Sequence, residues 1–231
     1  RSGYGYALQP AGAGTGLLLA RFVVPVMYIR IYPNNPQDRL VQLTVATLQK
    51  GGIVIYPTDS VYGMGCSIEH LGSVPRMERI KGYYTPSTRL SFLCYNLSQV
   101  SNYCRPVSNA VFRLIKKNLP GPFTFLLQGN SRVPRLFKGK KQTVGIRVPD
   151  NPILQVILRE LAVPIISTSL PWDETEPGYS SDPDLINERF GELVDIVIDG
   201  GPGGQDPSAI IDCTGAEPVI IRGGAKPLLD R

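Results

Sequence analysis

Short runs of apolar, mostly β-branched residues alternate with helix-like patterns along this chain from Met27 onward. Such alternation favours an α/β fold, in which helices pack around a central sheet. Strands are predicted at residues 28–32, 53–55, 90–94, 123–127, 143–148, 164–170, 195–198, 208–212 and 218–222. Helices are predicted at residues 36–50, 70–81, 107–118, 152–162 and 182–190, and turn-rich loops at 83–89 and 171–181.

Local patterns refine two of these elements. Residues 28–32 alternate apolar and polar side chains before Pro33, which is typical of an edge strand. The helix at 107–118 is expected to turn its apolar side chains inward, namely those of Val111, Phe112, Leu114 and Ile115.

Residues 1–26 differ from the rest, because they are rich in glycine and contain no acidic residue. We interpret them as a non-native upstream or disordered extension. A fragment of a basic organellar transit peptide is the alternative, and Arg21 directly after a short apolar run argues against a signal peptide. No linker or repeat divides residues 27–231, which are therefore predicted to form a single domain.

The composition is that of a globular protein, with 42% hydrophobic and 19% charged residues, and it excludes a disordered chain. A net charge of +5 permits a polyanionic ligand without requiring one. Four cysteines without C-x-x-C spacing indicate reduced, buried thiols of a cytoplasmic protein and argue against a zinc site. His70 lies in a predicted exposed loop without a G-x-S-x-G turn, which argues against a serine hydrolase.

A dense group of polar side chains follows the strand at 53–55. The hydroxyls of Thr58, Ser60 and Tyr62 are suited to orient a small polar ligand, and two following glycines allow close approach of the backbone. Arg147 and Arg222 each end an apolar run. Strand ends line the ligand crevice of α/β sheets, and a guanidinium there suits phosphate or carboxylate.

Two further segments have open interpretations. The basic turn at 138–141 is either a solvated hairpin tip or a phosphate contact. The glycine-rich segment at 200–204 lacks the Gly-Lys-Ser/Thr of a Walker loop, so it is either a plain turn or a loop that closes over a ligand.

Several ordered motifs together make the chain resemble the YrdC/YciO family, and its YciO branch more than the threonylcarbamoyl-AMP synthases proper. The motifs are GGIVIYPTDSVYG at 51–63, RIKG at 79–82, PGPFTF at 120–125, TVGIRVPD at 143–150, STSL at 167–170, DGG at 199–201, SAIID at 208–212 and IRGG at 221–224. The resemblance implies a YrdC-like open twisted mixed sheet with surrounding helices and a concave basic cavity.

The resemblance also implies an activity. The synthases join L-threonine, bicarbonate and ATP into threonylcarbamoyl-adenylate and pyrophosphate, which feeds a tRNA modification, threonylcarbamoyladenosine. ATP would enter as MgATP, with the metal held by phosphates and water rather than by a protein site. A double-stranded RNA or tRNA-binding module without this activity is the first alternative, and an enzyme with a different small-molecule substrate is the second.

Matching motifs assign roles residue by residue. The resemblance implies a threonine pocket made by Thr58, Tyr62, Thr124 and Ser208. It implies a nucleotide site made by Lys81, Arg89, Arg147, Thr168 and Arg222, in which Lys81 and Arg89 carry the catalytic charge. Three positions depart from the synthase pattern, because Tyr83 replaces an arginine, Cys94 a histidine and Leu170 an asparagine. Lost charged contacts cost about 1.5–3 kcal/mol each, so weak ATP turnover is expected.

Overall fold

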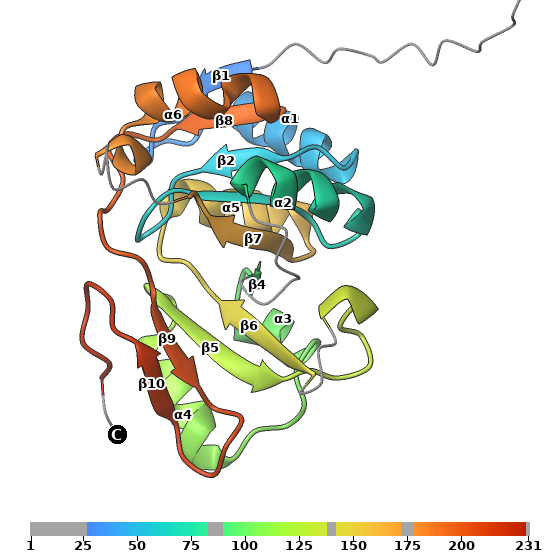
Figure 1. The fold of residues 1–231 in the computed structure, drawn as a ribbon, viewed down its shortest axis with the longest axis vertical. Coiled ribbons are helices and arrows are strands. Elements are labelled where there is room, and N and C mark those ends of the chain that lie inside the picture. The colour runs from blue at the N-terminus through green and yellow to red at the C-terminus, as the bar shows by residue number, and fades with distance from the viewer. Residues whose placement is uncertain (1–26, 83–89, 138–141, 172–177, 230–231) are drawn as a thin grey trace, which may run out of the picture.

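A computed structural model of the protein describes residues 27–82, 90–137, 142–171 and 178–229. Within this part of the chain, ten strands form one mixed sheet surrounded by helices (Figure 1). The strands are β1 (Met27–Arg30), β2 (Val54–Tyr56), β3 (Gly63–Ser67), β4 (Ser91–Leu93), β5 (Phe123–Gln128), β6 (Thr143–Arg147), β7 (Ile165–Ser169), β8 (Ile196–Asp199), β9 (Ala209–Asp212) and β10 (Val219–Arg222). The helices are α1 (Asp38–Gln49), α2 (Val74–Lys81), α3 (Leu97–Ser101), α4 (Asn109–Asn118), α5 (Pro152–Leu161) and α6 (Pro183–Phe190).

The strand order is β1-β8-β2-β3-β7-β4-β6-β5-β9-β10. Parallel pairs such as β4 with β6 occur beside antiparallel pairs such as β3 with β7, so the sheet is mixed as the resemblance implied. β1 forms one edge, which confirms the edge strand predicted from its alternating side chains. β10 forms the other edge, and the two edges lie at opposite ends of the long axis in Figure 1.

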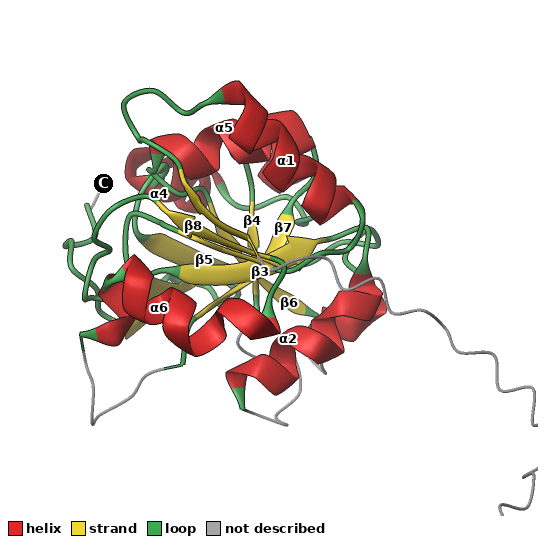
Figure 2. Cartoon of the chain, turned by 90° about the horizontal axis from the view of Figure 1, so that it is seen from above, coloured by secondary structure: helices red, strands yellow, loops and turns green. Residues whose placement is uncertain are grey.

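Alternate residues of the central strands enter two separate apolar clusters, because successive side chains of a strand point to opposite faces. Val54 and Tyr56 of β2 pack with α1 and α5, whereas Ile55 between them belongs to the cluster that includes residues of α2 and α6. Figure 2 shows the same division, with α1 and α5 on one side of the sheet and α2 and α6 on the other. The sheet is therefore buried on both faces in this half of the molecule.

Two elements were not predicted from the sequence. β3 has the composition Gly-Met-Gly-Cys-Ser, which is poor in β-branched residues, yet it lies between β2 and β7 in the middle of the sheet. The short helix α3 depends on Asn96, whose side chain accepts a hydrogen bond from the Gln99 backbone N–H. The other predicted strands and helices are present in the described residues, with ends shifted by a few positions.

One side-chain prediction is corrected by the structure. Phe112 was expected to face inward from α4, but its side chain is 49% exposed, while Val111, Leu114 and Ile115 are buried. His70, which was expected to be solvated, is partly exposed, and its Nε2 lies 2.6 Å from the Gln49 carbonyl oxygen at the end of α1. All four cysteines are free and buried, as predicted.

The predictions for residues 1–26, for the loop at 83–89, for the basic turn at 138–141 and for most of the loop at 171–181 concern residues outside the described part of the chain. None of the helices in the described part combines the length and apolarity that a membrane span requires.

Gly65 should be indispensable to β3, because a Cβ there would lie 2.5 Å from both Ile165 Cγ2 and the Tyr56 hydroxyl. We expect Gly65→Ala to lower the free energy of unfolding by about 1–3 kcal/mol through overpacking. Urea denaturation followed by circular dichroism measures this change. Gly72→Ala is the matched control, since a Cβ at Gly72 meets nothing within 4 Å and should change stability far less. Equal effects of the two substitutions would contradict the packing argument.

Candidate functional site

A cavity of about 410 Å³ lies where several strands of the sheet end. Eight of the nine site residues predicted from the sequence line it, although they come from widely separated segments: Thr58, Tyr62, Lys81, Thr124, Arg147, Thr168, Ser208 and Arg222. The ninth, Arg89, lies outside the described residues. The structure thus brings the predicted set together in one place, while the role of each residue stays a prediction.

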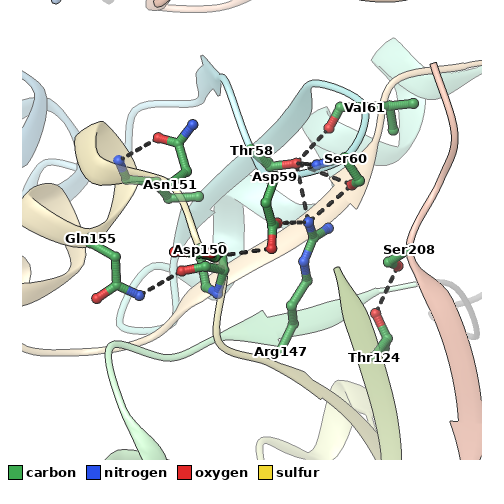
Figure 3. Close-up of polar contacts among 12 residues, drawn as sticks. Thr58, Asp59, Ser60, Val61, Thr124, Arg147, Asp150, Asn151, Gln155 and Ser208 are labelled. Atoms are coloured by element: carbon green, nitrogen blue, oxygen red, sulfur yellow. Dashed lines mark hydrogen bonds and ion pairs between the residues drawn. The ribbon is translucent and has the colours of Figure 1, made fainter. Parts of the chain in front are cut away.

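The centre of the site is the guanidinium of Arg147, which is held by the turn that follows β2 (Figure 3). Its Nη2 donates to Asp59, to the Ser60 hydroxyl at 2.9 Å and to the Thr58 hydroxyl at 3.2 Å. The side chains of Arg147 and Asp59 are only 9% and 7% exposed. The positive charge of Arg147 is therefore neutralised inside the protein by a carboxylate that the same motif supplies.

Asp59 uses both carboxylate oxygens. One accepts from Arg147, and the other accepts from the backbone N–H of Asp150 at 2.9 Å. The next residue, Asn151, caps the start of α5 by accepting from the Leu154 N–H at 3.1 Å (Figure 3). Asp59 thereby fixes the turn after β2 against the segment that joins β6 to α5.

The Nε of Arg147 is buried and has no hydrogen-bond partner among the described residues. A buried donor without an acceptor costs free energy, so the contacts of Nη2 must hold the guanidinium in place against this cost.

A second polar group lies across the cavity, on β5 and the start of β9. The hydroxyls of Thr124 and Ser208 are 2.9 Å apart, and both residues are buried (Figure 3). Arg222, which ends β10, donates from Nε and Nη2 to the Ser208 carbonyl oxygen at 3.2 and 2.7 Å. This backbone contact places the Arg222 guanidinium beside the hydroxyl pair.

Lys81 and Thr168 approach the cavity from α2 and β7. The Lys81 ammonium donates a short hydrogen bond to the Thr168 hydroxyl. Lys81 ends its helix, because Gly82 adopts a left-handed conformation with φ of 75°. The helix terminus therefore determines where this charge lies.

The Tyr62 hydroxyl is engaged by the glycine-rich segment rather than pointing freely to a ligand. It donates to the Gly201 carbonyl oxygen at 2.8 Å and accepts from the Gly200 N–H at 3.1 Å. Burial raises the pKa of Tyr62 to about 12, so the phenol stays neutral at physiological pH and keeps its proton for Gly201. Segment 200–204 is also tied to the motif turn by the Gly204 N–H, which donates to the Ser60 carbonyl oxygen.

The charged side chains that line the cavity are all positive among the described residues. Lys81, Arg147 and Arg222 line it, and no carboxylate does so among the described residues. Together with the hydroxyls, this arrangement can bind an anion that also offers hydrogen-bond donors and acceptors. No group of three or more histidine, cysteine or acidic residues that could hold a metal ion occurs in the described part of the chain.

The sequence reasoning missed several residues of this site. Asp59 was not singled out, although an acidic residue between Thr58 and Ser60, directly after a buried strand, is itself a signal of a paired charge. Ser91, Ser167 and Ser169 also line the cavity and carried no such signal.

Two of the three departures from the synthase pattern can be placed. Cys94 and Leu170 are buried in the same apolar cluster, and neither lines the cavity. The Leu170 backbone N–H donates to the Tyr62 carbonyl oxygen at 3.3 Å. Tyr83 lies outside the described residues.

A family model and the sequences of curated proteins relate this chain to the same family. The family model Sua5_yciO_yrdC, described as telomere recombination, matches residues 46–224. The chain is 42% identical to the protein YciO of Escherichia coli (strain K12) over 206 residues, which are 87% of this chain and 98% of YciO. It is 29% identical to a threonylcarbamoyl-AMP synthase of Halorhodospira halophila, covering 78% of this chain and 93% of the synthase.

Solved structures agree with this. The crystal structure of E. coli YciO superimposes with a TM-score of 0.79, covering 88% of this chain and 99% of YciO. The structure of P. abyssi Sua5 complexed with L-threonine superimposes with a TM-score of 0.77 at 25% identity. It covers 87% of this chain but 58% of the Sua5 chain, so Sua5 has a further part that this chain does not match.

The buried pair of Arg147 and Asp59 leads to a stability prediction. We expect Asp59→Asn to lower the free energy of unfolding by about 3–5 kcal/mol, because it leaves the buried Arg147 without a counter-charge. Urea denaturation measures the loss. Adding Arg147→Met to Asp59→Asn should recover much of it, since no charge is then buried.

The control for this prediction is the exposed pair of Arg159 and Glu160, whose side chains are 54% and 38% exposed. Glu160→Gln should change stability by less than about 0.5 kcal/mol. A loss for Asp59→Asn no larger than that for Glu160→Gln would show that the buried pair does not hold the site together.

Proposed function

From the premise that the chain belongs to the Sua5/YciO/YrdC family, we propose that it is a nucleotidyltransferase of the threonylcarbamoyl-AMP synthase type. Its substrates would be L-threonine, bicarbonate and ATP, and its products threonylcarbamoyl-adenylate and pyrophosphate. The observation that carries this proposal is the single cavity that gathers three cations and two groups of buried hydroxyls. The product would feed tRNA modification in the cytoplasm, where free buried thiols persist.

The chemistry needs no protein nucleophile. The amine of threonine and bicarbonate first give a carbamate and water. A carbamate oxygen then attacks the α-phosphorus of ATP, and the bond from that phosphorus to the bridging oxygen breaks as pyrophosphate leaves. Catalysis then consists of positioning the two reactants and stabilising the charge that develops on the phosphates. A magnesium ion that accompanies ATP would be held by phosphates and water. This agrees with the absence of carboxylates among the described residues that line the cavity.

The residues divide by position. Lys81 and Arg222, together with Arg89, would offset the charge of the triphosphate. The hydroxyl pair of Thr124 and Ser208 would orient the amino acid, and their mutual hydrogen bond at 2.9 Å holds each in place before the substrate arrives. On the opposite wall, the Thr58 hydroxyl accepts a hydrogen bond from Arg147, which fixes its position.

Thr124→Val should test the hydroxyl pair, because it removes a donor and acceptor while keeping the size of the side chain. We expect kcat/KM for threonine to fall about 10- to 100-fold, the equivalent of ~1.5–3 kcal/mol. The measurement is pyrophosphate release with ATP, Mg²⁺, bicarbonate and L-threonine. Thr47→Val is the control, since the Thr47 hydroxyl donates within α1 to the Leu43 carbonyl oxygen at 2.9 Å. Absence of threonine- and bicarbonate-dependent release in the unchanged protein would sink the proposal, and salt-sensitive binding of an RNA duplex would then favour the RNA-binding alternative.

Position 170, where the synthases have an asparagine, tests whether that amide is needed for ATP turnover in this protein. Restoring the amide by Leu170→Asn should not raise ATP turnover, because position 170 is buried in the apolar cluster and does not line the cavity. It should instead lower the free energy of unfolding by roughly 2–4 kcal/mol, from lost packing and a buried amide. Parallel pyrophosphate and urea measurements decide this. Ser169→Asn, at an exposed position that lines the cavity, is the matched variant that should leave stability nearly unchanged.

A further inference from the structure

Phe112, whose inward orientation was wrongly predicted, lies at an apolar groove outside the candidate site. The groove has a volume of about 520 Å³ and lies between α3, the segment that precedes α4, α4 itself and β5. Its lining is mostly apolar and includes Leu97, Val107, Phe112, Ile115 and Leu127. It shares no residue with the lining of the cavity described above, so it is a separate feature of the surface.

The segments that form this groove carry charge of one sign. None of the 19 acidic residues of the chain lies between Arg79 and Pro149, whereas 12 of the 24 basic residues do. On the described surface of this stretch, the exposed charges are all positive: Arg105, Arg113, Lys116, Lys117, Arg132 and Arg135. The segments that form the groove therefore contribute exposed cations and no carboxylate.

Helix geometry places basic side chains at the edge of the groove. Asn109 and Phe112 of α4 line it, and Lys116 follows Phe112 by one turn on the same stripe of the helix. Arg113 follows Asn109 in the same way. Arg105 lines the groove directly from the segment that precedes α4. An apolar hollow thus has cations along its rim.

We propose that this groove binds an acidic amphipathic segment of a partner protein. An apolar side chain of that segment would pack against Phe112, and its carboxylates would pair with Arg105, Arg113 and Lys116. Charge complementarity selects this occupant, because the groove needs apolar atoms and its rim needs anions at the same time. The backbone of a nucleic acid would supply anions for the rim but no apolar side chain for the groove. The proposal is independent of the activity of the cavity.

The test uses the full chain and a fluorescein-labelled peptide of about five helical turns, with leucines at i, i+3 and i+7 and glutamates on the remaining faces. Fluorescence anisotropy gives its dissociation constant. We expect Phe112→Ser and Lys116→Glu each to raise that constant about 10-fold. Arg39→Glu, an equal charge change at an exposed position of α1, should leave it within about 2-fold.

The design separates this occupant from others. A peptide in which alanine replaces the leucines should bind at least about 10-fold more weakly, because the groove is then left unfilled. Equal binding of the two peptides, or an equal effect of Lys116→Glu and Arg39→Glu, would overturn the proposal. So would a preference of the same surface for an RNA duplex, for anionic vesicles or for a second copy of the chain seen by light scattering.

Folding and activity provide the controls. Phe112 is half exposed and Lys116 exposed, so circular dichroism and the Tm of both variants should match those of the unchanged protein. Pyrophosphate release should also be unaffected, because neither residue lines the cavity. Loss of peptide binding together with loss of folded signal in both variants would contradict the surface placement on which the proposal depends.

Discussion

The ion pair of Arg147 and Asp59 is the interaction on which the site depends. The two residues are 88 positions apart in sequence and both are almost fully buried. A buried guanidinium without a counter-charge would cost several kcal/mol, so the fold is stable only when the turn after β2 closes on the end of β6. That closure also sets the start of α5, through the Asp150 backbone and the Asn151 cap. Stability and site geometry therefore follow from the same contact.

This pairing changes how the charge of the cavity acts on a ligand. Arg147 contributes little net charge, because Asp59 neutralises it, and its Nη2 holds the hydroxyls of Thr58 and Ser60 in place. Lys81 contacts the Thr168 hydroxyl, and Arg222 contacts the Ser208 carbonyl oxygen. The cavity thus combines a neutralised guanidinium and buried hydroxyls with two further basic side chains. Such a combination suits a substrate pair in which one member is compact and polar and the other is a polyphosphate.

Most strands and helices could be predicted from the sequence. Their apolar residues repeat with the period of a strand or a helix, and turn residues such as glycine and proline bound each run. It missed β3 because Gly63 and Gly65 have no β propensity, and this strand is selected by the close approach of Tyr56 and Ile165. Thr58, Tyr62, Arg147 and Arg222 were indicated by their positions after apolar runs. The other cavity residues, such as Thr124 and Ser208, were reached only through the family resemblance, because each belongs to one of its motifs. Asp59 as a partner of Arg147 and the exposure of Phe112 depend on contacts between distant segments, which no local pattern contains.

Leu170 shows why a motif comparison and a structure answer different questions. By comparison with the family motif, Leu170 replaces an asparagine, and the replacement was interpreted as the loss of an amide contact to the nucleotide. In the structure, the Leu170 side chain is buried in an apolar cluster. Its backbone N–H donates to the Tyr62 carbonyl oxygen. Replacing a polar side chain by leucine at such a position removes a buried amide that would need partners. The substitution is then compatible with a stable site, because Leu170 does not line the cavity. The chemistry of this branch therefore depends on what the remaining hydroxyls and cations can bind.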